Sequence, residues 1–476
     1  MKKIKSYLFC IVMILLTTFT VSATPINTCT RISVPGEYIL IQDILNSDIP
    51  NCITIAANDV VFDGAGHIID GDGQTNYGIL TNGIVGTVIK NVNLRDWNTR
   101  SINIISSNSG FFENITISGG DFDGFYLKTS NNNTLRNITV VGSGHVGFTF
   151  DSSYGNRLSN SLFQHNPWED FDIYITGGIA SCDNVVSNVS LTKHQLHYYN
   201  SSVTLRNEVV GSLYLCNADN SLIENVIVDS TNEQNSISNY YVENSVYRNI
   251  TTIGLREAIF FKNSEDNEVI NIVMRDGWNG ISYSTGTRNI NYNNATIYNM
   301  SGRAVRIYGE SSSNIIRNSR FYNNAVGIYI NTMGKNGANT IYNSYFNNTQ
   351  NIEWGIPDFF GNGIVYFNNW NIAKTPGTNI ISGLYLGGNF WASPSGNGYS
   401  QICDDSDSDG ICNIPYTVGT QNIDYFPLSS STNTPPPTPP PTPTNTPPPP
   451  PPITPSKWAI VILVIIISTV IFTRKK

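Results

Sequence analysis

The sequence predicts an all-β fold, a right-handed parallel β-helix solenoid of about twelve coils, and three observations support this prediction. The first is a repeat of about 23 residues without helical periodicity, which is typical of a solenoid whose units must stack to bury a core. The second is that each unit contains two short alternating runs typical of strands. The third is general: parallel crossovers are overwhelmingly right-handed.

Asparagines mark the repeat. Each marker opens a short apolar or Thr-rich run, such as Asn-Ile-Thr-Ile from Asn114. One asparagine at the same corner of every coil predicts a ladder of stacked side chains that bond their neighbours and cap backbone groups left free by the turn. The markers are Asn91, Asn114, Asn137, Asn160, Asn249, Asn271, Asn294, Asn318 and Asn343.

A typical unit covers residues 133–151. Ile138 and Val140 alternate with polar residues in its first predicted strand, and Phe148 and Phe150 do so in its second, after a Gly-rich turn. We expect each coil to return its strands beside those of the previous coil, so that parallel sheets form. Residues 24–90 are expected to form an N-terminal cap and the first coils, residues 91–385 the repeats, and residues 386–428 a C-terminal segment.

The repeat becomes irregular between Asn160 and Asn225, where the steps are 28, 19 and 18 residues. A longer excursion falls at residues 165–183. Loops that project from a regular scaffold are where binding usually takes place, so this region is a candidate for function.

Both ends of the chain predict export and anchoring. Residues 1–23 combine a basic start, an apolar stretch and small residues at the end, as in a secretory signal peptide. Residues 429–456 are rich in Pro and Thr and predict an extended stalk. Residues 457–473 are predicted to form a transmembrane helix, because the nearly unbroken apolar run from Trp458 to Thr473 lies between Lys457 and a basic tail at 474–476; this favours a membrane span over a buried core helix. We therefore expect a cell-surface, single-pass membrane protein with its N-terminal region outside.

The composition limits the class of partner. The net charge is −8, the pI is about 5.2 and only 13% of residues are charged. A nucleic-acid partner would require a clustered basic face, which the sequence lacks outside the termini. Hydroxyl, amide and aromatic side chains are abundant instead, which favours a polysaccharide or cell-surface glycan as partner.

Six cysteines remain after removal of the signal peptide, and an even number in an exported chain favours disulfides. Sequence neighbours suggest the pairs Cys29–Cys52, Cys182–Cys216 and Cys403–Cys412. Fifteen connectivities are possible for six cysteines, so the pairing stays open at this point.

Residues 58–71, together with Tyr77-Gly-Ile-Leu and Val88-Ile-Lys-Asn-Val-Asn-Leu, resemble the opening coils of NosD-like parallel β-helix repeat proteins. The resemblance covers residues 32–428 and implies a right-handed β-helix; related carbohydrate-binding and sugar-hydrolase helices share the repeat. Its family name comes from a copper-accessory protein, yet we expect no copper site, because the soft ligands are scattered along the chain. Those ligands are Met274, Met300, Met333, His67, His145, His165, His194 and His197.

An acidic segment near the C-terminus predicts a calcium site. Asp405, Asp407 and Asp409 alternate, and Gly410 stands at the sixth position, where a calcium loop turns sharply. Ile411 would contribute its backbone carbonyl oxygen and Asn413 its side-chain oxygen. No Glu closes the twelfth position, and an acidic turn without a ligand is the alternative. The segment also resembles the Asp-rich tail of these β-helix proteins, in which an Asp usually stands at the place of Asn413.

The turns that follow the marker asparagines offer a second candidate site, because stacking places them along one edge of the solenoid. Paired carboxylates beside a His are suited to acid and base catalysis on a sugar chain. If the protein is an enzyme, the candidate residues are Asp121, Asp123, His145, His165, Glu169 and Asp170. The rings expected to stack on sugar faces are Trp97, Phe122, Tyr126 and Trp168.

Three functions are compatible with this pattern. A membrane-anchored carbohydrate-binding or envelope and adhesion module fits the composition best. A polysaccharide lyase, hydrolase or uronate epimerase is the enzymatic alternative, and it would use the edge with Asp121, Asp123 and His145. A purely structural envelope protein is the third. Turns are polar in most proteins, so polar residues on this edge do not by themselves select among the three.

Overall fold

The computed structural model describes residues 23–430 except 230–234, 255, 333 and 356–363, all within the compact unit Met1–Thr434. Apart from Ala23, Ser429 and Ser430, the expected signal peptide, linker, transmembrane helix and tail lie outside the described residues. Within the described ranges, no helix is long and apolar enough to cross a membrane.

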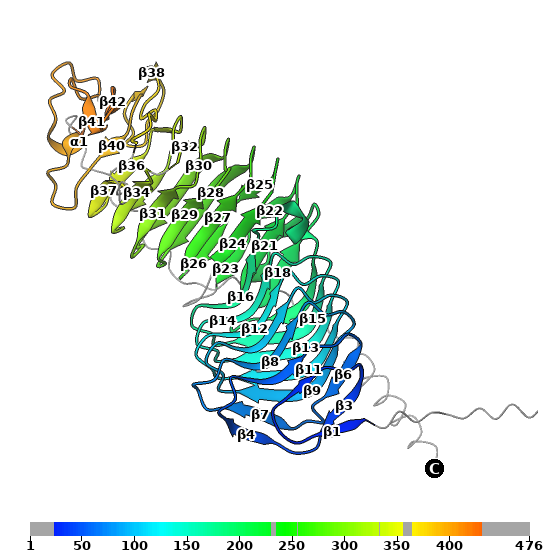
Figure 1. Cartoon of the computed structure of the whole chain (residues 1–476). Coiled ribbons are helices and arrows are strands. Elements are labelled where there is room, and N and C mark those ends of the chain that lie inside the picture. The colour runs from blue at the N-terminus through cyan, green and yellow to red at the C-terminus, as the bar shows by residue number, and fades with distance from the viewer. Residues whose placement is uncertain (1–22, 230–234, 255, 333, 356–363, 431–476) are drawn as a thin grey trace, which may run out of the picture. The chain divides into compact units, whose positions relative to one another are not determined.

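The chain winds into about 14 turns of parallel β-helix, rather than the predicted twelve or so (Figure 1). One sheet of 18 strands runs through the whole solenoid. It contains β1(Thr24–Ile26), β3(Gly36–Leu40), β4(Ile44–Ser47), β6(Val60–Asp63), β7(Ile68–Gly71), β9(Val88–Arg95), β11(Phe111–Ser118), β13(Thr134–Val141), β15(Arg157–Gln164), β17(Val185–Ser190), β18(Gln195–Tyr199), β21(Ser212–Cys216), β24(Asn235–Tyr240), β27(Glu257–Lys262), β29(Asn279–Tyr283), β31(Arg303–Ile307), β34(Val326–Ile330) and β37(Gln350–Trp354).

The other strands of the first coils form a seven-stranded sheet. It contains β2(Thr30–Ile32), β5(Asn51–Ile55), β8(Tyr77–Asn82), β10(Arg100–Ile105), β12(Asp123–Lys128), β14(Val146–Asp151) and β16(Glu169–Tyr174). We call the coils of residues 24–190 the N-terminal stack. The predicted register is confirmed here: Ile115 pairs with Ile138, and Phe125 pairs with Phe148, each one repeat further along the chain.

The later coils, residues 195–391, form the C-terminal stack, whose other strands belong to a 13-stranded sheet. It contains β19(Thr204–Arg206), β20(Val209–Val210), β22(Leu222–Glu224), β23(Ile227–Asp229), β25(Val246–Arg248), β26(Thr251–Ile253), β28(Glu268–Arg275), β30(Asn291–Tyr298), β32(Ile315–Arg317), β33(Arg320–Tyr322), β35(Thr340–Tyr342), β36(Tyr345–Asn347) and β40(Phe390–Trp391). Two hairpins and two short helices complete the description: β38(Thr375–Pro376) with β39(Tyr385–Leu386), β41(Tyr416–Gly419) with β42(Asn422–Asp424), η1(Ile179–Cys182) and α1(Tyr399–Ile402).

The predicted asparagine ladder is confirmed. Asn114 Nδ2 donates to Asn91 Oδ1 at 3.0 Å, and Asn137 Nδ2 donates to Asn114 Oδ1 at 3.0 Å. The same pattern continues in the C-terminal stack, where Asn249 Nδ2 lies 2.9 Å from Asn225 Oδ1. These residues have φ near +54°, a left-handed conformation that asparagine tolerates better than most residues. The asparagine therefore makes the sharp corner and bonds the coil beside it.

The two stacks meet at a reversal of the chain. β17 and β18 pair antiparallel, with Val189 opposite Leu196, and β18 then pairs parallel with β21. Strands of the shared sheet after this point therefore run opposite to those before it. This reversal was not predicted from the sequence, although it lies in the region where the repeat becomes irregular.

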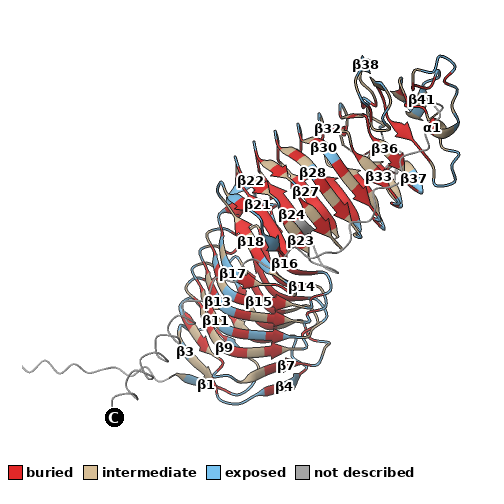
Figure 2. Ribbon diagram, turned by 180° about the vertical axis from the view of Figure 1, so that it is seen from behind, coloured by how far each residue is buried: buried red, intermediate tan, exposed pale blue. Residues whose placement is uncertain are grey.

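Each stack has its own core on a different face of the shared sheet. Successive side chains of a strand point to opposite faces. In β21, Tyr214 and Cys216 belong to the apolar core of the N-terminal stack, whereas Leu213 and Leu215 belong to that of the C-terminal stack. Every residue of β21 is buried as a result, and Figure 2 shows buried strands through both stacks. The last coil of the N-terminal stack thus lies against the back of the sheet that closes the C-terminal stack.

The three predicted disulfides, Cys29–Cys52, Cys182–Cys216 and Cys403–Cys412, are confirmed. Cys182 ends η1 in the N-terminal stack and Cys216 ends β21 in the shared sheet. This bond therefore joins the two stacks covalently at the place where they meet. Tyr214 Oη adds a hydrogen bond across the same contact, donating to the carbonyl oxygen of Phe171 at 2.9 Å.

Candidate functional site

A cleft of about 350 Å³ lies where the two stacks meet, and we call it the junction cleft. β16 forms one wall, since it is the last strand of the seven-stranded sheet. The back of the shared sheet forms the floor, with residues from β24, β27 and β31. The residues that line the cleft are His145, Trp168, Glu169, Asp172, Ile173, Tyr174, Ile175, Thr176, Tyr240, Arg256, Glu257, Phe260, Lys262, Arg306 and Tyr308.

The β-register explains why the floor side chains converge. Phe260 pairs with Ser238 on one side and with Ser282 on the other, and Ser282 pairs with Arg306. All of them point to the face opposite the core of the C-terminal stack, which takes the alternate residues Ile259 and Phe261. Beyond β24 the N-terminal stack covers this face only in part, since Phe260 of β27 is half-buried against the N-terminal core. The cleft therefore forms because the two cores lie on opposite faces of the shared sheet.

Two buried acidic side chains, Glu169 and Asp172, lie in the wall. Burial, and then the charge of Asp172, raises the pKa of Glu169 well above its usual range. Burial also raises the pKa of Asp172, although its carboxylate accepts hydrogen bonds from the Ile173 amide at 2.6 Å and from Tyr174. A neutral Glu169 can donate to the Asp172 carboxylate, so the pair holds one proton between two carboxyl groups.

Arg256 faces this pair from the C-terminal stack. Its Nη1 lies 3.7 Å from Glu169 Oε1, and its guanidinium lies 3.7 Å from the ring centroid of Trp168. The neighbouring carboxylate of Glu257 is held more tightly. It accepts hydrogen bonds from Asn279 Nδ2 at 3.0 Å, from Arg306 Nη1 at 3.1 Å and from Ser282 Oγ. Acidic and basic groups from both stacks thus meet in one cleft.

A row of stacked groups leads to the cleft along one edge of the solenoid. Phe122 stacks on His145 with 4.3 Å between ring centroids, and His145 stacks on Trp168 at 5.0 Å. Arg256 covers the other face of Trp168 and approaches Trp278 at 5.8 Å. Trp168 is 42% exposed, yet its ring faces are occupied, so the row presents ring edges and polar nitrogen atoms to solvent.

Asp123 and His145 are brought together as the sequence suggested. His145 Nδ1 lies 2.8 Å from Asp123 Oδ1, and Arg100 Nε donates to Asp123 Oδ2 at 3.1 Å. Asp123 is buried, and both of its carboxyl oxygens are engaged. The geometry orients the imidazole of His145 in the row of stacked groups.

The other predicted edge residues do not join Asp123 and His145 in one site: Asp121 lies in a separate depression, whereas Asp170 and His165 are both bonded to Thr192. Asp121 lines a separate acidic depression of about 240 Å³ with Asp72 and Asp96. The carboxylate of Asp170 is buried and accepts hydrogen bonds from Asn166 Nδ2 at 2.8 Å and from Thr192 Oγ1 at 2.8 Å, so it ties two coils together. His165 lies on a turn with φ of 57°, where its backbone N–H donates to Thr192 Oγ1.

Two of the four expected sugar-stacking rings are not at the surface. Trp97 is 1% exposed and packs in the core, with its indole N–H donating to the carbonyl oxygen of Ile69. Tyr126 is 8% exposed, donates to Asp151 Oδ2 at 2.5 Å and lies under the guanidinium of Arg100. Their rings offer no free face to a ligand, which corrects that expectation. Phe122 and Trp168 remain exposed in the row.

Sequence reasoning missed most of the cleft, including Asp172, Tyr174, Arg256, Glu257, Lys262 and Arg306. Four of these residues belong to the C-terminal stack, about 90 to 140 positions beyond Glu169 in the chain. A single 23-residue period predicts contacts between neighbouring coils, not between coils on either side of a reversal. The run Leu213–Cys216, apolar at four successive positions, was the available signal for a strand buried on both faces.

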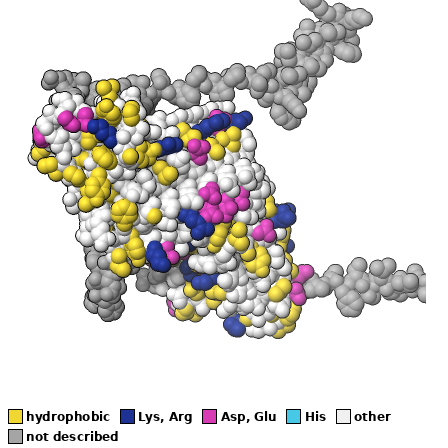
Figure 3. Space-filling model, turned by 90° about the horizontal axis from the view of Figure 1, so that it is seen from above, with side chains coloured by type: hydrophobic (Ala, Val, Ile, Leu, Met, Phe, Trp, Pro, Cys, Tyr) yellow, Lys and Arg dark blue, Asp and Glu magenta, His cyan; other side chains and the backbone are white. Residues whose placement is uncertain are grey.

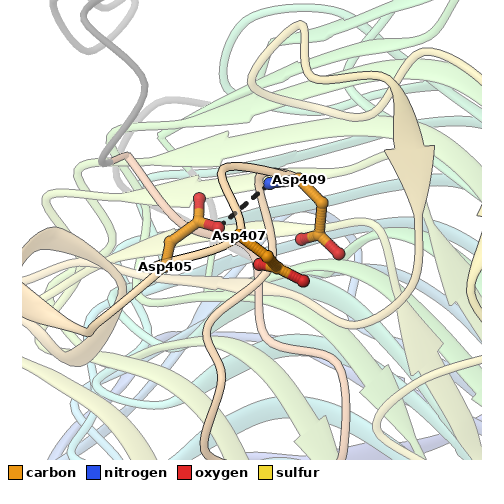
Figure 4. A group of neighbouring side chains, drawn as sticks. All are labelled: Asp405, Asp407 and Asp409. Atoms are coloured by element: carbon orange, nitrogen blue, oxygen red, sulfur yellow. Dashed lines mark hydrogen bonds between the residues drawn. The ribbon is translucent and has the colours of Figure 1, made fainter.

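The predicted calcium ligands converge partly. One oxygen from each of Asp405, Asp407 and Asp409 lies within 4.8 Å of the others, and no second group of three His, Cys, Asp or Glu ligands occurs in the described residues. Figure 4 shows the carboxylates of Asp407 and Asp409 side by side, with Asp405 turned toward the Asp409 amide, which donates to it at 3.1 Å. Lys374 forms an ion pair with Asp409, and Asn413 Nδ2 donates to Asp404 and Ser406. An all-oxygen donor set of this kind suits calcium.

On the face shown in Figure 3, acidic and basic side chains lie in small separate groups with uncharged surface between them. Of the soft ligands, Met274 and Met300 are buried in the core of the C-terminal stack, and His197 Nδ1 lies 3.1 Å from Tyr199 Oη. Met333 lies outside the described residues.

Two sequence-family models match the chain. One, described as a right-handed β-helix region, matches residues 77–212, and the other, described as periplasmic copper-binding protein (NosD), matches residues 195–396. The two ranges overlap where the stacks meet. They support the predicted right-handed parallel β-helix and the predicted resemblance to NosD-like β-helix repeat proteins, although the NosD model matches a later part of the chain than the residues that suggested it.

Solved structures with some similarity were also found. The A-module of mannuronan C-5 epimerase AlgE6 from Azotobacter vinelandii is 14% identical, with 70% of this chain and 88% of that chain covered and a TM-score of 0.27. The catalytic domain of a GH87 α-1,3-glucanase is 13% identical, with coverages of 67% and 62% and a TM-score of 0.27. The receptor-binding domain of the Siphovirus 9NA tailspike is 11% identical, with coverages of 72% and 76% and a TM-score of 0.24. We base no argument on these similarities. No curated protein matches the chain at a significant level.

Proposed function

Since this chain belongs to the right-handed parallel β-helix repeat family, we propose that it is a cell-surface protein that binds polysaccharide or cell-surface glycan in the junction cleft. The observation that carries this proposal is the composition of the cleft. Tyr174, Tyr240, Phe260 and Tyr308 provide rings, and charged groups of both signs lie between them. Sugars present hydroxyl groups beside apolar ring faces, and a few convergent polar groups among aromatic walls suit such ligands.

A glycan array probed with the full-length chain in mild detergent tests this proposal. We expect binding that weakens at least tenfold, about 1.4 kcal/mol, in Trp168→Ala, because this ring lines the cleft and supports Arg256. The matched control is Tyr425→Ala, an exposed aromatic residue that does not line the cleft, and it should leave binding unchanged. Equal loss in both variants, or no glycan bound by the parent chain, would reject the proposal.

The same samples distinguish the alternatives. Release of unsaturated or reducing ends from a bound polysaccharide would favour the enzyme that uses Asp121, Asp123 and His145. The pairing of His145 with Asp123 is the observation in favour of this second function. Absence of both binding and product would favour the structural envelope role.

The proposal includes attachment to the membrane. Residues 1–23 have the composition of a signal peptide, residues 429–456 that of a stalk, and residues 457–476 that of a transmembrane helix with a basic tail. Deletion of residues 457–476 should move the protein from the membrane fraction to the culture medium. Retention of the truncated chain in the membrane fraction would contradict this part.

We also assign a structural calcium site to Asp405, Asp407, Asp409, the carbonyl oxygen of Ile411 and Asn413. The convergence of three carboxylates supports it, since hard cations prefer oxygen ligands. Bound calcium would neutralise the repulsion among these carboxylates and brace the loop closed by Cys403–Cys412. The ion pair between Lys374 and Asp409 is a competitor for one ligand.

A further inference from the structure

We infer that Asn132 is an N-glycosylation site: its side-chain amide nitrogen carries an attached glycan on the exported chain, and the other acceptor motifs of the sequence stay unmodified. The inference requires export, which the composition of residues 1–23 predicts. It goes beyond the proposed function, because it concerns a sugar joined covalently to the protein and not one bound in the junction cleft. The contacts of each candidate asparagine carry it.

The acceptor motif for N-linked glycans, Asn-x-Ser or Asn-x-Thr, occurs nine times in the sequence. A glycan is bulky and lies at the surface of a folded protein, so the fold limits which of these asparagines can carry one. The nine are Asn114, Asn132, Asn137, Asn188, Asn200, Asn249, Asn294, Asn299 and Asn347.

Five of the nine belong to the asparagine ladder. Their amide nitrogens donate to the asparagine of a neighbouring coil, as Asn294 Nδ2 does to Asn271 Oδ1 at 2.9 Å. Neighbouring strands lie about 4.8 Å apart, so a sugar on a ladder nitrogen would occupy space that the next coil needs. The stacked fold therefore excludes these five, which are Asn114, Asn137, Asn188, Asn249 and Asn294.

Three further acceptor asparagines have side chains held by hydrogen bonds. Asn200 Nδ2 donates to a backbone carbonyl oxygen at 3.1 Å, and Asn299 Nδ2 donates to Asp276 Oδ1 at 3.0 Å. Asn347 bonds the side chain of Tyr345, and its own Oδ1 is buried. A sugar on any of these side chains would compete with the bond that holds it.

Asn132 differs from the other eight. It is exposed, and its amide nitrogen makes no hydrogen bond among the residues that the structure describes. It lies in the turn between β12 and β13 with φ of 58°. Loops that project from the surface are where such acceptors are expected. The atom that becomes modified is therefore both accessible and free.

The neighbours of Asn132 on the adjacent coils are small. The positions one repeat away hold Ser109 and Gly155, which share its left-handed conformation with φ of 55° and 68°. A Cβ atom at Gly155 would clash with Asn132 Oδ1, so the glycine leaves space for this side chain. At this corner, in contrast to the ladder, a sugar on Nδ2 has no asparagine on either side to displace.

The modification is a group transfer from a lipid-phosphate-linked sugar, the co-reactant that a membrane transferase would supply. A bond forms between Asn132 Nδ2 and the anomeric carbon of the sugar, and the bond from that carbon to the phosphate oxygen breaks. The lipid phosphate leaves, and the amide loses one proton. Asn132 precedes β13 and His145 follows it, so the attached glycan would lie at the other end of this strand from the junction cleft.

Mass spectrometry of tryptic peptides from the full-length chain, purified from its own cells, tests the inference. Cleavage after Lys128 and Arg136 isolates residues 129–136, which contain Asn132 and no other acceptor motif. We expect this peptide to carry the mass of a glycan and the peptides with the other eight motifs to be unmodified. An unmodified peptide 129–136, or a glycan on Asn299, would overturn the inference and leave the proposed binding in the cleft untouched.

Variants identify the modified atom. Asn132→Gln and Thr134→Val each remove the motif and should abolish the attached glycan, whereas Thr134→Ser keeps the motif and should retain it. Asn299→Gln is the matched control, since Asn299 is also exposed with φ of 58° but has a bonded amide, and it should leave the glycan on peptide 129–136 unchanged. A sugar that persists in Asn132→Gln would be linked to the hydroxyl of Thr129, Ser130 or Thr134, and the inference would be wrong.

Discussion

Leu213 and Tyr214 are neighbours in β21, yet their side chains are buried in two different apolar cores. One residue closes the C-terminal stack and the next closes the end of the N-terminal stack. The single strand β21 therefore contributes side chains to both apolar cores. Substitutions at Leu213 and at Tyr214 can perturb each core separately.

Tyr214→Ala should loosen the N-terminal stack selectively. The ring is completely buried, and truncation of a buried aromatic costs about 3–5 kcal/mol. Hydrogen exchange should rise in β14 and β16, whereas Leu213→Ala should raise it in β22, β25 and β28. Tyr214→Phe, which loses the bond to the Phe171 carbonyl oxygen, should cost about 1 kcal/mol. The same exchange pattern in both alanine variants would contradict separate cores.

Substitutions at Asn137 should separate the two roles of the ladder. Asn137→Ala loses the hydrogen bond to Asn114 and also places an alanine at φ of 54°, so we expect a loss of about 2 kcal/mol. Asn137→Gly loses the hydrogen bond but tolerates the backbone conformation, so its cost should be smaller. Denaturant unfolding measures both. A glycine variant less stable than the alanine variant would show that the left-handed corner is not the dominant constraint.

Stability should fall as pH rises above the ordinary pKa of a glutamate, 4.5, because the pKa of Glu169 is raised in the folded protein. In that range the unfolded chain has released the proton that the folded chain still holds, so a rise in pH favours unfolding. The buried carboxyl of Asp424, whose pKa burial raises to about 7, contributes in the same direction.

Glu169→Gln tests this pH dependence. The amide can donate to Asp172 as the neutral acid does, without ever ionising. We therefore expect a higher Tm than that of the parent chain at pH 8, a smaller difference at pH 5, and a residual slope from Asp424. Glu169→Ala, which removes the donor, should be destabilised at both pH values. An unchanged pH profile in Glu169→Gln would show that this carboxyl does not hold the proton.

Calcium should raise Tm if the Asp405, Asp407 and Asp409 loop binds it. At a free calcium concentration of 100 times Kd, the expected stabilisation is about 2.7 kcal/mol. Asp407→Ala should abolish the shift, and Lys374→Met should enlarge it, because Asp409 is then released from its ion pair. Magnesium serves as the control ion. A shift that persists in Asp407→Ala would place the ion elsewhere.

The sequence predicted the features that depend on one repeat and its neighbour. The register of Ile115 with Ile138 and the stacking of Asn114 and Asn137 follow from the local period. Proximity in the sequence suggested the three cysteine pairs that the structure contains, without excluding the other connectivities. The β17–β18 reversal does not follow from the period, because the irregular steps between Asn160 and Asn225 show that the repeat changes there without showing that the strand direction reverses.

The restriction of sequence reasoning to neighbouring coils also explains which residues of the candidate site were predicted and which were not. Trp97 and Tyr126 were expected at the surface because turns are usually exposed, but Trp97 fills the core and Tyr126 bonds Asp151. Glu169 was identified as a candidate, whereas its partner Arg256 belongs to the other stack. Contacts between residues so far apart in the chain depend on how much the axis of the solenoid shifts at the reversal, which no local pattern specifies.

The cleft is lined by residues in or next to β16, β24, β27 and β31, with His145 from the preceding coil, and this position in the middle of the solenoid has an evolutionary consequence. Whole coils can be duplicated or deleted toward either terminus without altering a side chain that lines the cleft. The length of the solenoid and its ligand preference can therefore diverge independently. An insertion between Cys182 and Cys216 would have the opposite effect, because it would separate the walls. Descendants of this chain should therefore vary in length at their ends while the middle stays constant.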